Sequence, residues 1–151
     1  MKKKILLSLL VILVVIQFIH PAKNQSAELP ASDISKVTKV PEDVQKILKT
    51  ACYDCHSNNT VYPWYNNIQP VAWWLNHHVE EGKEHLNFSE FGTYAAKKAN
   101  HKLHEVAETI EKGEMPLSSY TIIHKDAILS DEQKQLVIDW ANNTVIADAG
   151  H

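Results

Sequence analysis

The amino-acid sequence predicts an all-α protein, and three observations lead to this prediction. Apolar residues recur every three or four positions in several long segments, which is the spacing of one helical face. Residues that begin or end helices, such as Pro41, Gly113 and Ser130, separate these segments. No segment alternates apolar and polar residues as a half-buried strand does, and no stretch repeats. The length of 151 residues fits one domain preceded by a targeting segment.

Residues 1–22 have the composition of a signal peptide or an N-terminal membrane anchor. Three lysines at positions 2–4 precede an apolar run from Ile5 to Ile19. The run has the length of a signal-peptide core and is short for a membrane-spanning helix. No clean cleavage pattern follows in residues 21–27, so a cleaved signal peptide and a retained anchor both fit the sequence. In both cases we expect an exported, periplasmic body that is soluble or anchored to the inner membrane.

The charge of the exported body excludes some classes of partner. Setting Lys2, Lys3 and Lys4 aside leaves 12 of the 15 basic residues against 18 acidic residues, a net charge of −6, and there is no arginine. An acidic body does not bind nucleic acid or anionic lipid through electrostatic attraction. We therefore expect no nucleic-acid partner, and membrane contact only through the N-terminal segment if it is uncleaved.

The first helix of the body is predicted to begin at Pro41. The preceding residues 23–40 mix small, polar and charged types without periodicity, so we interpret them as a linker. Proline suits the first position of a helix. The apolar stripe that follows continues into the two cysteines of the chain: Val44, Leu48, Ala51, Cys52 and Cys55. The predicted domain covers residues 41–145, and residues 146–151 form a tail.

A second helix is predicted from near Pro70 to Glu81, with Gly82 at its end. Residues 57–60 break the first helix, and an aromatic-rich loop at residues 61–67 lies between the two helices. A turn at residues 87–91 follows the second helix.

Two further helices complete the expected domain. One runs from Thr93 to Lys112 and ends at Gly113, with this apolar face: Ala96, Ala99, Leu103, Val106, Ala107 and Ile110. A loop covers residues 114–129. The last helix begins at Ser130, which forms a capping box with Gln133, and its apolar side consists of Leu136, Val137 and Trp140.

The two cysteines and the next histidine form a Cys-x-x-Cys-His motif at Cys52, Cys55 and His56. A disulfide across so short a loop would add little stability. A thiol oxidoreductase would need a βαβ pattern, which is absent. Haem attachment explains each position, because the two thiols add to the two haem vinyl groups and the histidine is the proximal iron ligand. The sequence therefore predicts one covalently bound haem c per chain.

The second axial ligand of the iron is predicted to be Met115. Only Met1 and Met115 are methionines, and Met115 lies at the start of the loop between the last two predicted helices, directly before Pro116. A thioether ligand raises the reduction potential relative to a second imidazole. The alternatives are that Met115 fills a gap in the core, or that His77 or His78 is the distal ligand.

Two other features of the second helical region have alternative interpretations. Trp64 and Trp73 could form walls of the haem pocket, although ordinary core packing explains them nearly as well. The spacing of His77, Glu81 and His85 could place zinc or copper ligands on one helical face, although a solvated polar face is the simpler interpretation.

The sequence resembles a family of small bacterial cytochrome-c-like proteins with one Cys-x-x-Cys-His motif, the haem-binding domain family. The resemblance covers residues 40–142 and is carried by these stretches: ACYDCHSN at 51–58, YPWY at 62–65, PVAWWL at 70–75, HHVEEG at 77–82, HLNFS at 85–89, GEMP at 113–116 and LSDE at 129–132. It implies a cytochrome-c-like α-helical fold, covalent haem c and a redox role, without naming a partner.

The function expected from the sequence is that of an exported mono-haem c-type cytochrome that transfers single electrons. Iron with ligands on both axial sides has no open position, which favours an electron carrier over an enzyme. The alternative is a haem-dependent peroxidase or small-ligand sensor with an open or labile distal site. The redox partner protein is not indicated.

Overall fold

The structure is a computed structural model and describes residues 1–147. It has eight α-helices and three 3-10 helices: α1 (Lys2–Ile16), α2 (Ile34–Val37), α3 (Glu42–Ala51), α4 (Tyr53–His56), η1 (Trp64–Asn67), α5 (Val71–His85), η2 (Phe88–Thr93), α6 (Ala96–Glu111), α7 (Ser118–Thr121), η3 (Lys125–Ala127) and α8 (Asp131–Asn143). No strand occurs in the described residues, so the predicted all-α class is confirmed. Of the predicted tail, residues 148–151 lie outside the described part.

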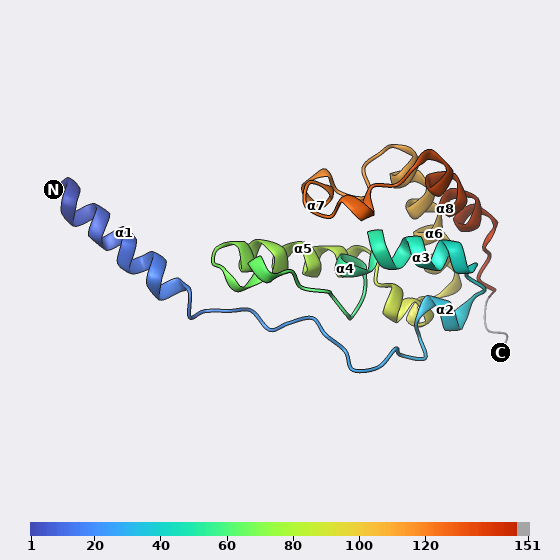
Figure 1. The fold of residues 1–151 in the computed structure, drawn as a ribbon. Coiled ribbons are helices and arrows are strands. Elements are labelled where there is room, and N and C mark those ends of the chain that lie inside the picture. Colours follow the sequence, from blue (N-terminus) through green and yellow to red (C-terminus); the bar gives the residue numbers. More distant parts are fainter. Residues whose placement is uncertain (148–151) are drawn as a thin grey trace.

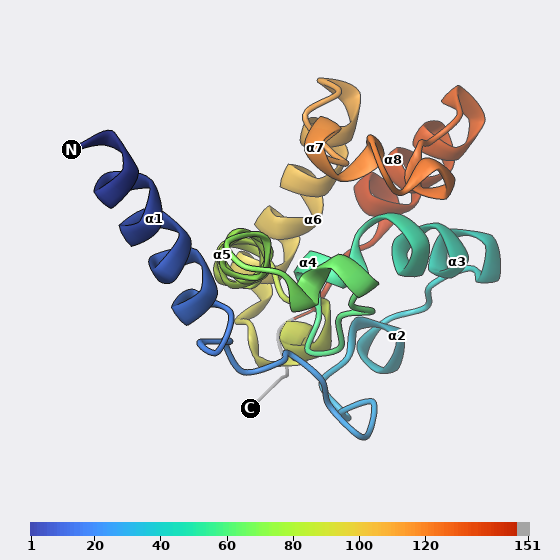
Figure 2. The same cartoon turned by 60° about the vertical axis from the view of Figure 1, so that its left-hand side comes forward.

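The core of the body lies between α3, α6 and α8 (Figure 1 and Figure 2). Apolar side chains of all three helices meet in one cluster that includes Val44, Leu48, Leu103, Ala107 and Val137. These residues recur at helical spacing in the sequence, which is why the positions of the three helices could be predicted from their apolar stripes.

The sequence predicted one helix that carries both cysteines, but the structure has two. α3 ends at Ala51, and Cys52 has φ −126° and ψ −40°, outside helical geometry. The short helix α4 then restarts at Tyr53, with the amide of His56 donating to the carbonyl of Cys52 at 2.9 Å. The break turns the chain, so Cys55 and His56 do not continue the α3 stripe.

The second helix, α5, extends past its predicted end. Gly82 was expected to stop it, yet α5 continues to His85 and closes with the amide of Leu86 bonded to the carbonyl of Gly82 at 2.9 Å. The glycine is needed for another reason. A Cβ atom at position 82 would lie 2.7 Å from the backbone oxygen of Cys55, so only glycine allows α5 to pack this closely against α4.

The helices α6 and α8 follow the predictions with two adjustments. Every member of the predicted α6 face is buried except Val106, which is half-buried, and Gly113 adopts φ +70° where the helix ends. Thr93 belongs to η2, so α6 begins at Ala96. Leu136 of α8 is exposed, and the buried side consists of Val137, Trp140 and Ala141.

The expected linker at residues 23–40 packs against the domain. Ile34 of α2 is fully buried in the main core, and Asp33 caps α2 by accepting from the amide of Ser35 at 2.9 Å. A segment without periodicity in sequence therefore becomes part of the core, because a single buried isoleucine leaves no repeating pattern.

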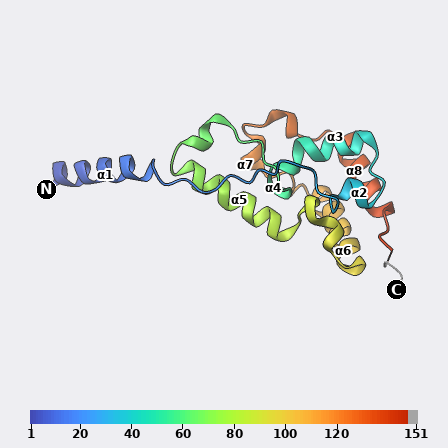
Figure 3. The same cartoon turned by 90° about the horizontal axis from the view of Figure 1, so that it is seen from below.

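The first helix, α1, projects from one end of the body (Figure 1 and Figure 3). None of its residues is buried. Within residues 1–147, no helix combines the length and apolarity that a membrane crossing requires.

We expect Ser130→Ala to lower the free energy of unfolding by about 1 kcal/mol, because Ser130 forms the N-cap of α8. Its hydroxyl accepts from the amide of Gln133 at 3.2 Å, and the Gln133 side chain accepts from the amide of Ser130 at 2.9 Å. Urea unfolding followed by circular dichroism measures the change. Ser118→Ala, at an exposed helix start whose N-cap is Leu117, is the matched control. Equal stability of the two variants would contradict the capping role.

Candidate functional site

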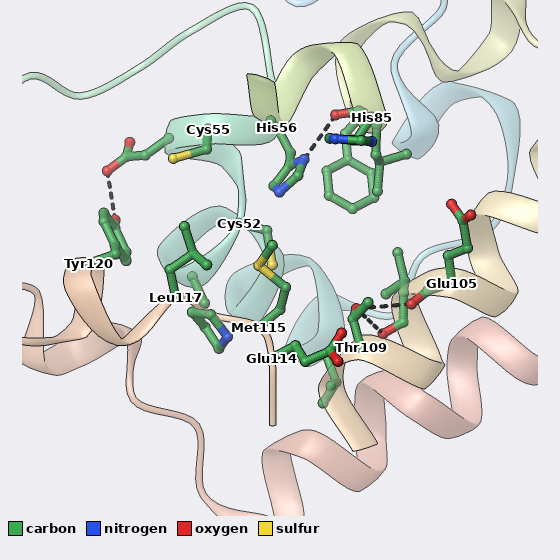
Figure 4. Close-up of a pocket in the computed structure, with 18 of the residues that line it drawn as sticks. Cys52, Cys55, His56, His85, Glu105, Thr109, Glu114, Met115, Leu117 and Tyr120 are labelled. Atoms are coloured by element: carbon green, nitrogen blue, oxygen red, sulfur yellow. Dashed lines mark hydrogen bonds between the residues drawn. The ribbon is translucent and has the colours of Figure 1, made fainter. Parts of the chain in front are cut away.

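A cavity of about 510 Å³ lies between α4, α5, α6 and the segment that leads into α7. Its volume is within the range of about 300–1,000 Å³ that is usual for cofactor and ligand sites. Cys52, Cys55, His56 and Met115 all line it, and Figure 4 shows these side chains around the same space. The structure therefore brings together the two predicted attachment thiols and both predicted iron ligands.

The imidazole of His56 is oriented by the backbone that follows α5. Its Nδ1 atom lies 3.0 Å from the carbonyl oxygen of Leu86. A carbonyl only accepts, so Nδ1 carries the proton and donates, and Nε2 keeps its lone pair. Burial lowers the pKa of His56, which favours the neutral ring. A neutral imidazole whose other nitrogen is bonded to a carbonyl is the usual state of a metal-binding histidine.

The two thiols are held in their protonated form. Burial is the main cause that raises the pKa of Cys52 to about 12 and the pKa of Cys55 to about 11, and the nearby Asp54 carboxylate adds to the shift at Cys55. A redox dithiol needs a lowered pKa, because the thiolate is the reactive species. The site therefore does not have the electrostatics of a thiol oxidoreductase.

The loop that carries Met115 is fastened to the domain on both sides of this residue. The amides of Glu114 and Met115 both donate to the carbonyl oxygen of Thr109 in α6, at 2.9 and 3.2 Å. Further along, the hydroxyl of Tyr120 donates to the Asp54 carboxylate at 2.7 Å, which ties α7 to α4. Burial is the main cause that raises the pKa of Tyr120, so the phenol stays protonated and keeps this bond.

The structure distinguishes the two histidines that were alternatives to Met115. His78 lines the cavity, whereas His77 is 69% exposed and lies 3.8 Å from the Glu81 carboxylate. His85 also lines the cavity, which the sequence analysis did not predict. The sequence does contain the spacing that would indicate it, because His78, Gly82 and His85 lie at i, i+4 and i+7 on one helical face. The helix was expected to end at Gly82, so this face was not extended to His85.

Trp64 and Trp73, which were expected as possible haem-pocket walls, are not among the residues that line this cavity. The indole of Trp73 instead donates to the carbonyl of Ile19 at 3.1 Å. Trp74 lies one turn before His78 on the same face of α5, and it lines a smaller adjoining cavity of about 350 Å³. A shift of one residue turns a helical side chain by about 100°, which separates the two tryptophans.

Among the described residues, no group of three or more histidine, cysteine, aspartate or glutamate side chains is arranged to hold a metal ion. The spacing of His77, Glu81 and His85 therefore does not produce a zinc or copper site in residues 1–147.

The donor set at the cavity fits haem. Two thiols lie within one helical turn, a neutral imidazole follows them, and a thioether comes from a separate loop. Apolar side chains of Leu86, Phe88, Ile110 and Leu129 also line the space, as a porphyrin requires. An all-helical domain with these groups around one cavity defines a haem-binding protein.

The comparison with known families agrees with this class. A family model described as "Haem-binding domain" matches residues 11–143, so the chain belongs to the haem-binding domain family. The resemblance found in the sequence is thereby confirmed, and family membership supports haem as the cofactor. No curated protein matches the chain. No solved structure matches it either.

Proposed function

We propose that this protein is an exported mono-haem c-type cytochrome that transfers single electrons. In this proposal Cys52 and Cys55 hold haem c through thioether bonds, His56 is the proximal iron ligand and Met115 is the distal ligand. The observation that carries the proposal is that one cavity collects these four side chains from two separate parts of the chain.

The cysteines fix the cofactor. Each thiol would hold haem through a thioether, in which the S–H has added across one vinyl group with sulfur on one vinyl carbon and the proton on the other. Cys52 lies at the break between α3 and α4, whereas Cys55 and His56 belong to α4, so the two thiols are held by different local backbone geometry. When bound, haem supplies an iron atom that changes between ferric and ferrous states.

The remaining groups orient the ligands. The carbonyl of Leu86 accepts from Nδ1 of His56, which directs Nε2 away from that carbonyl and increases its basicity as a ligand. The carbonyl of Thr109 accepts from two successive amides and so restrains the backbone at Met115. Ligands on both axial sides would leave no open position, which suits electron transfer rather than catalysis.

The second candidate function is that of a haem-dependent peroxidase or small-ligand sensor. Two further imidazoles, those of His78 and His85, line the same cavity and favour this alternative.

We expect Met115→Ala to remove the weak far-red ferric absorption band that marks thioether ligation and to lower the reduction potential. The variant should also bind carbon monoxide readily in the ferrous state, whereas the unmodified protein should not. Spectroscopy of protein expressed with the haem-attachment machinery measures both effects. His77→Ala, on the exposed side of α5, is the control and should leave the spectrum unchanged.

An unchanged spectrum in Met115→Ala would show that Met115 is not a ligand, and a changed spectrum in His78→Ala would then identify the alternative. Ready binding of carbon monoxide to the unmodified ferrous protein would favour the sensor or peroxidase function.

A further inference from the structure

The C-terminal end of α1 is bonded to the domain instead of leading into a free tether. The amide of Gln69 donates to the side-chain oxygen of Gln17 at 3.0 Å, and the Gln17 side chain donates back to the Gln69 carbonyl at 3.2 Å. The carbonyl of Ile19 accepts from the Gln69 side chain at 2.6 Å and from the indole of Trp73 at 3.1 Å. Gln69 is buried, so these bonds satisfy polar groups with little access to water.

The residues that follow are bonded to the domain as well. Asn24 donates through its side chain to the carbonyl of Ser57 at 2.8 Å and to the hydroxyl of Thr60 at 2.9 Å. Its amide donates to the Tyr62 hydroxyl at 2.9 Å, and its side-chain oxygen accepts from Lys83 at 2.7 Å. Cleavage in this region would remove partners of groups beside the attachment turn. The family match begins at residue 11, inside α1, and so includes these residues.

Beyond Lys2, Lys3 and Lys4, the helix α1 is apolar on every side, with Ser8 as its one polar residue. All its leucine and valine side chains and Ile5 and Ile12 are at least half exposed, and none of its residues is buried. A helix without a polar side is stable only where apolar surroundings cover it on all sides, in a large protein core or in lipid. Lysines 2–4 lie at the end of α1 that is distant from the domain.

The domain surface next to the other end of α1 is rich in exposed aromatic and aliphatic side chains. Trp64 of η1 is 76% exposed, Ile68 is 44% exposed and Trp73 of α5 is 39% exposed. Phe18, in the junction itself, is 83% exposed. We call these four residues the junction face. Tryptophan is enriched at the boundary between lipid and water, where its ring is apolar and its N–H finds a polar partner.

We propose that the apolar segment from Ile5 to Ile19 is retained in the mature protein, inserts into a lipid bilayer, and brings the junction face of the haem domain into contact with the near headgroup region. Because α1 by itself is too short to cross the hydrocarbon core, the long side chains of Lys2, Lys3 and Lys4 extend from its end to the far headgroups. The order along the molecule matches a bilayer better than a protein groove: lysines first, then an apolar helix, then exposed tryptophans. Membrane contact therefore extends beyond the N-terminal segment to the folded domain. The proposal does not depend on which residue is the distal iron ligand.

The first part of the test is the mass of the full-length gene product after expression with the haem-attachment machinery. We expect the intact mass to include residues 1–22 plus haem, and the protein to stay in the membrane fraction after an alkaline carbonate wash. A mature chain that starts within or after residues 17–24 would overturn the proposal, while its haem spectrum would still test the function separately.

The second part maps lipid contacts of the same protein in vesicles of phosphatidylethanolamine and phosphatidylglycerol that contain a photoactivatable phospholipid. We expect lipid adducts on α1 and on peptides from residues 61–73. The double variant Trp64→Ser with Ile68→Ser should lose the adducts on residues 61–73 and keep those on α1. Adducts confined to α1 in the unmodified protein would overturn contact by the junction face.

A matched control replaces two exposed apolar residues near and within α8, toward the end of the molecule opposite α1 (Figure 3). These are Ile128, which is 54% exposed, and Leu136, which is 41% exposed. Ile128→Ser with Leu136→Ser should leave every lipid adduct unchanged. Loss of the adducts on residues 61–73 in this control would show that general surface hydrophobicity, and not the junction face, produces them.

Discussion

Covalent haem is expected to be absent from the double variant Cys52→Ser with Cys55→Ser. A hydroxyl does not replace a thiol in forming a bond to a haem vinyl group, and the chain has no other cysteine. Both thiols line the cavity that also contains His56 and Met115, so their loss removes every attachment point in this site. Intact mass and haem staining after denaturing electrophoresis measure the result, and the loss should be complete.

The control for this variant is Asn59→Ser, which places a serine at an exposed position close to the motif. It should retain haem at the level of the unmodified protein. Covalent haem in the double cysteine variant, or its absence from the unmodified protein, would contradict the proposed attachment chemistry.

The second large effect is expected from Gly82→Ala. The added Cβ would lie 2.7 Å from the backbone oxygen of Cys55 and 3.0 Å from its Cβ atom, and backbone atoms in a packed turn cannot move aside easily. Alanine favours a helix by up to about 1 kcal/mol over glycine, whereas overpacking costs about 1–3 kcal/mol. We therefore expect a net loss of stability on the order of 1–2 kcal/mol.

The same substitution should affect the site itself. Pushing α5 away from α4 would also displace Leu86, whose carbonyl orients the His56 imidazole. We expect less haem per chain and an altered spectrum, measured together with urea unfolding. Glu80→Ala, at an exposed position two residues away in α5, should change neither. Gly82→Ala with full stability and normal haem content would show that α5 does not pack against the attachment turn as described.

The parts of the fold that could be predicted from the sequence depend on local patterns. The apolar faces of α3, α6 and most of α8 repeat every three or four residues. The start of α8 depends on Ser130 and Gln133, three positions apart, and the end of α6 depends on one glycine with φ +70°. Each of these signals lies within one or two helical turns, so it can be recognised without knowing the tertiary structure.

The sequence identified which residue types form the candidate site, but not which other residues line the cavity around them. The Cys-x-x-Cys-His motif and the one methionine of the body identified the groups that line the cavity. The contribution of His85 was missed because the helix was expected to end at Gly82, and only the structure shows that α5 continues to His85. The position of Trp73 outside this cavity could not be predicted either, because the rotation of α5 about its axis depends on its close packing against α4.

The amino-acid sequence by itself determined the helical class, the Cys-x-x-Cys-His motif, and an N-terminal segment in which three lysines precede an apolar run. Only the tertiary structure decided which face of α5 meets the cavity, that Leu86 orients His56, and that residues 17–24 belong to the folded domain. The physical reason is that these features depend on backbone contacts between distant segments. Backbone carbonyls and amides are the same in every residue type, so their long-range partners leave little trace in the sequence.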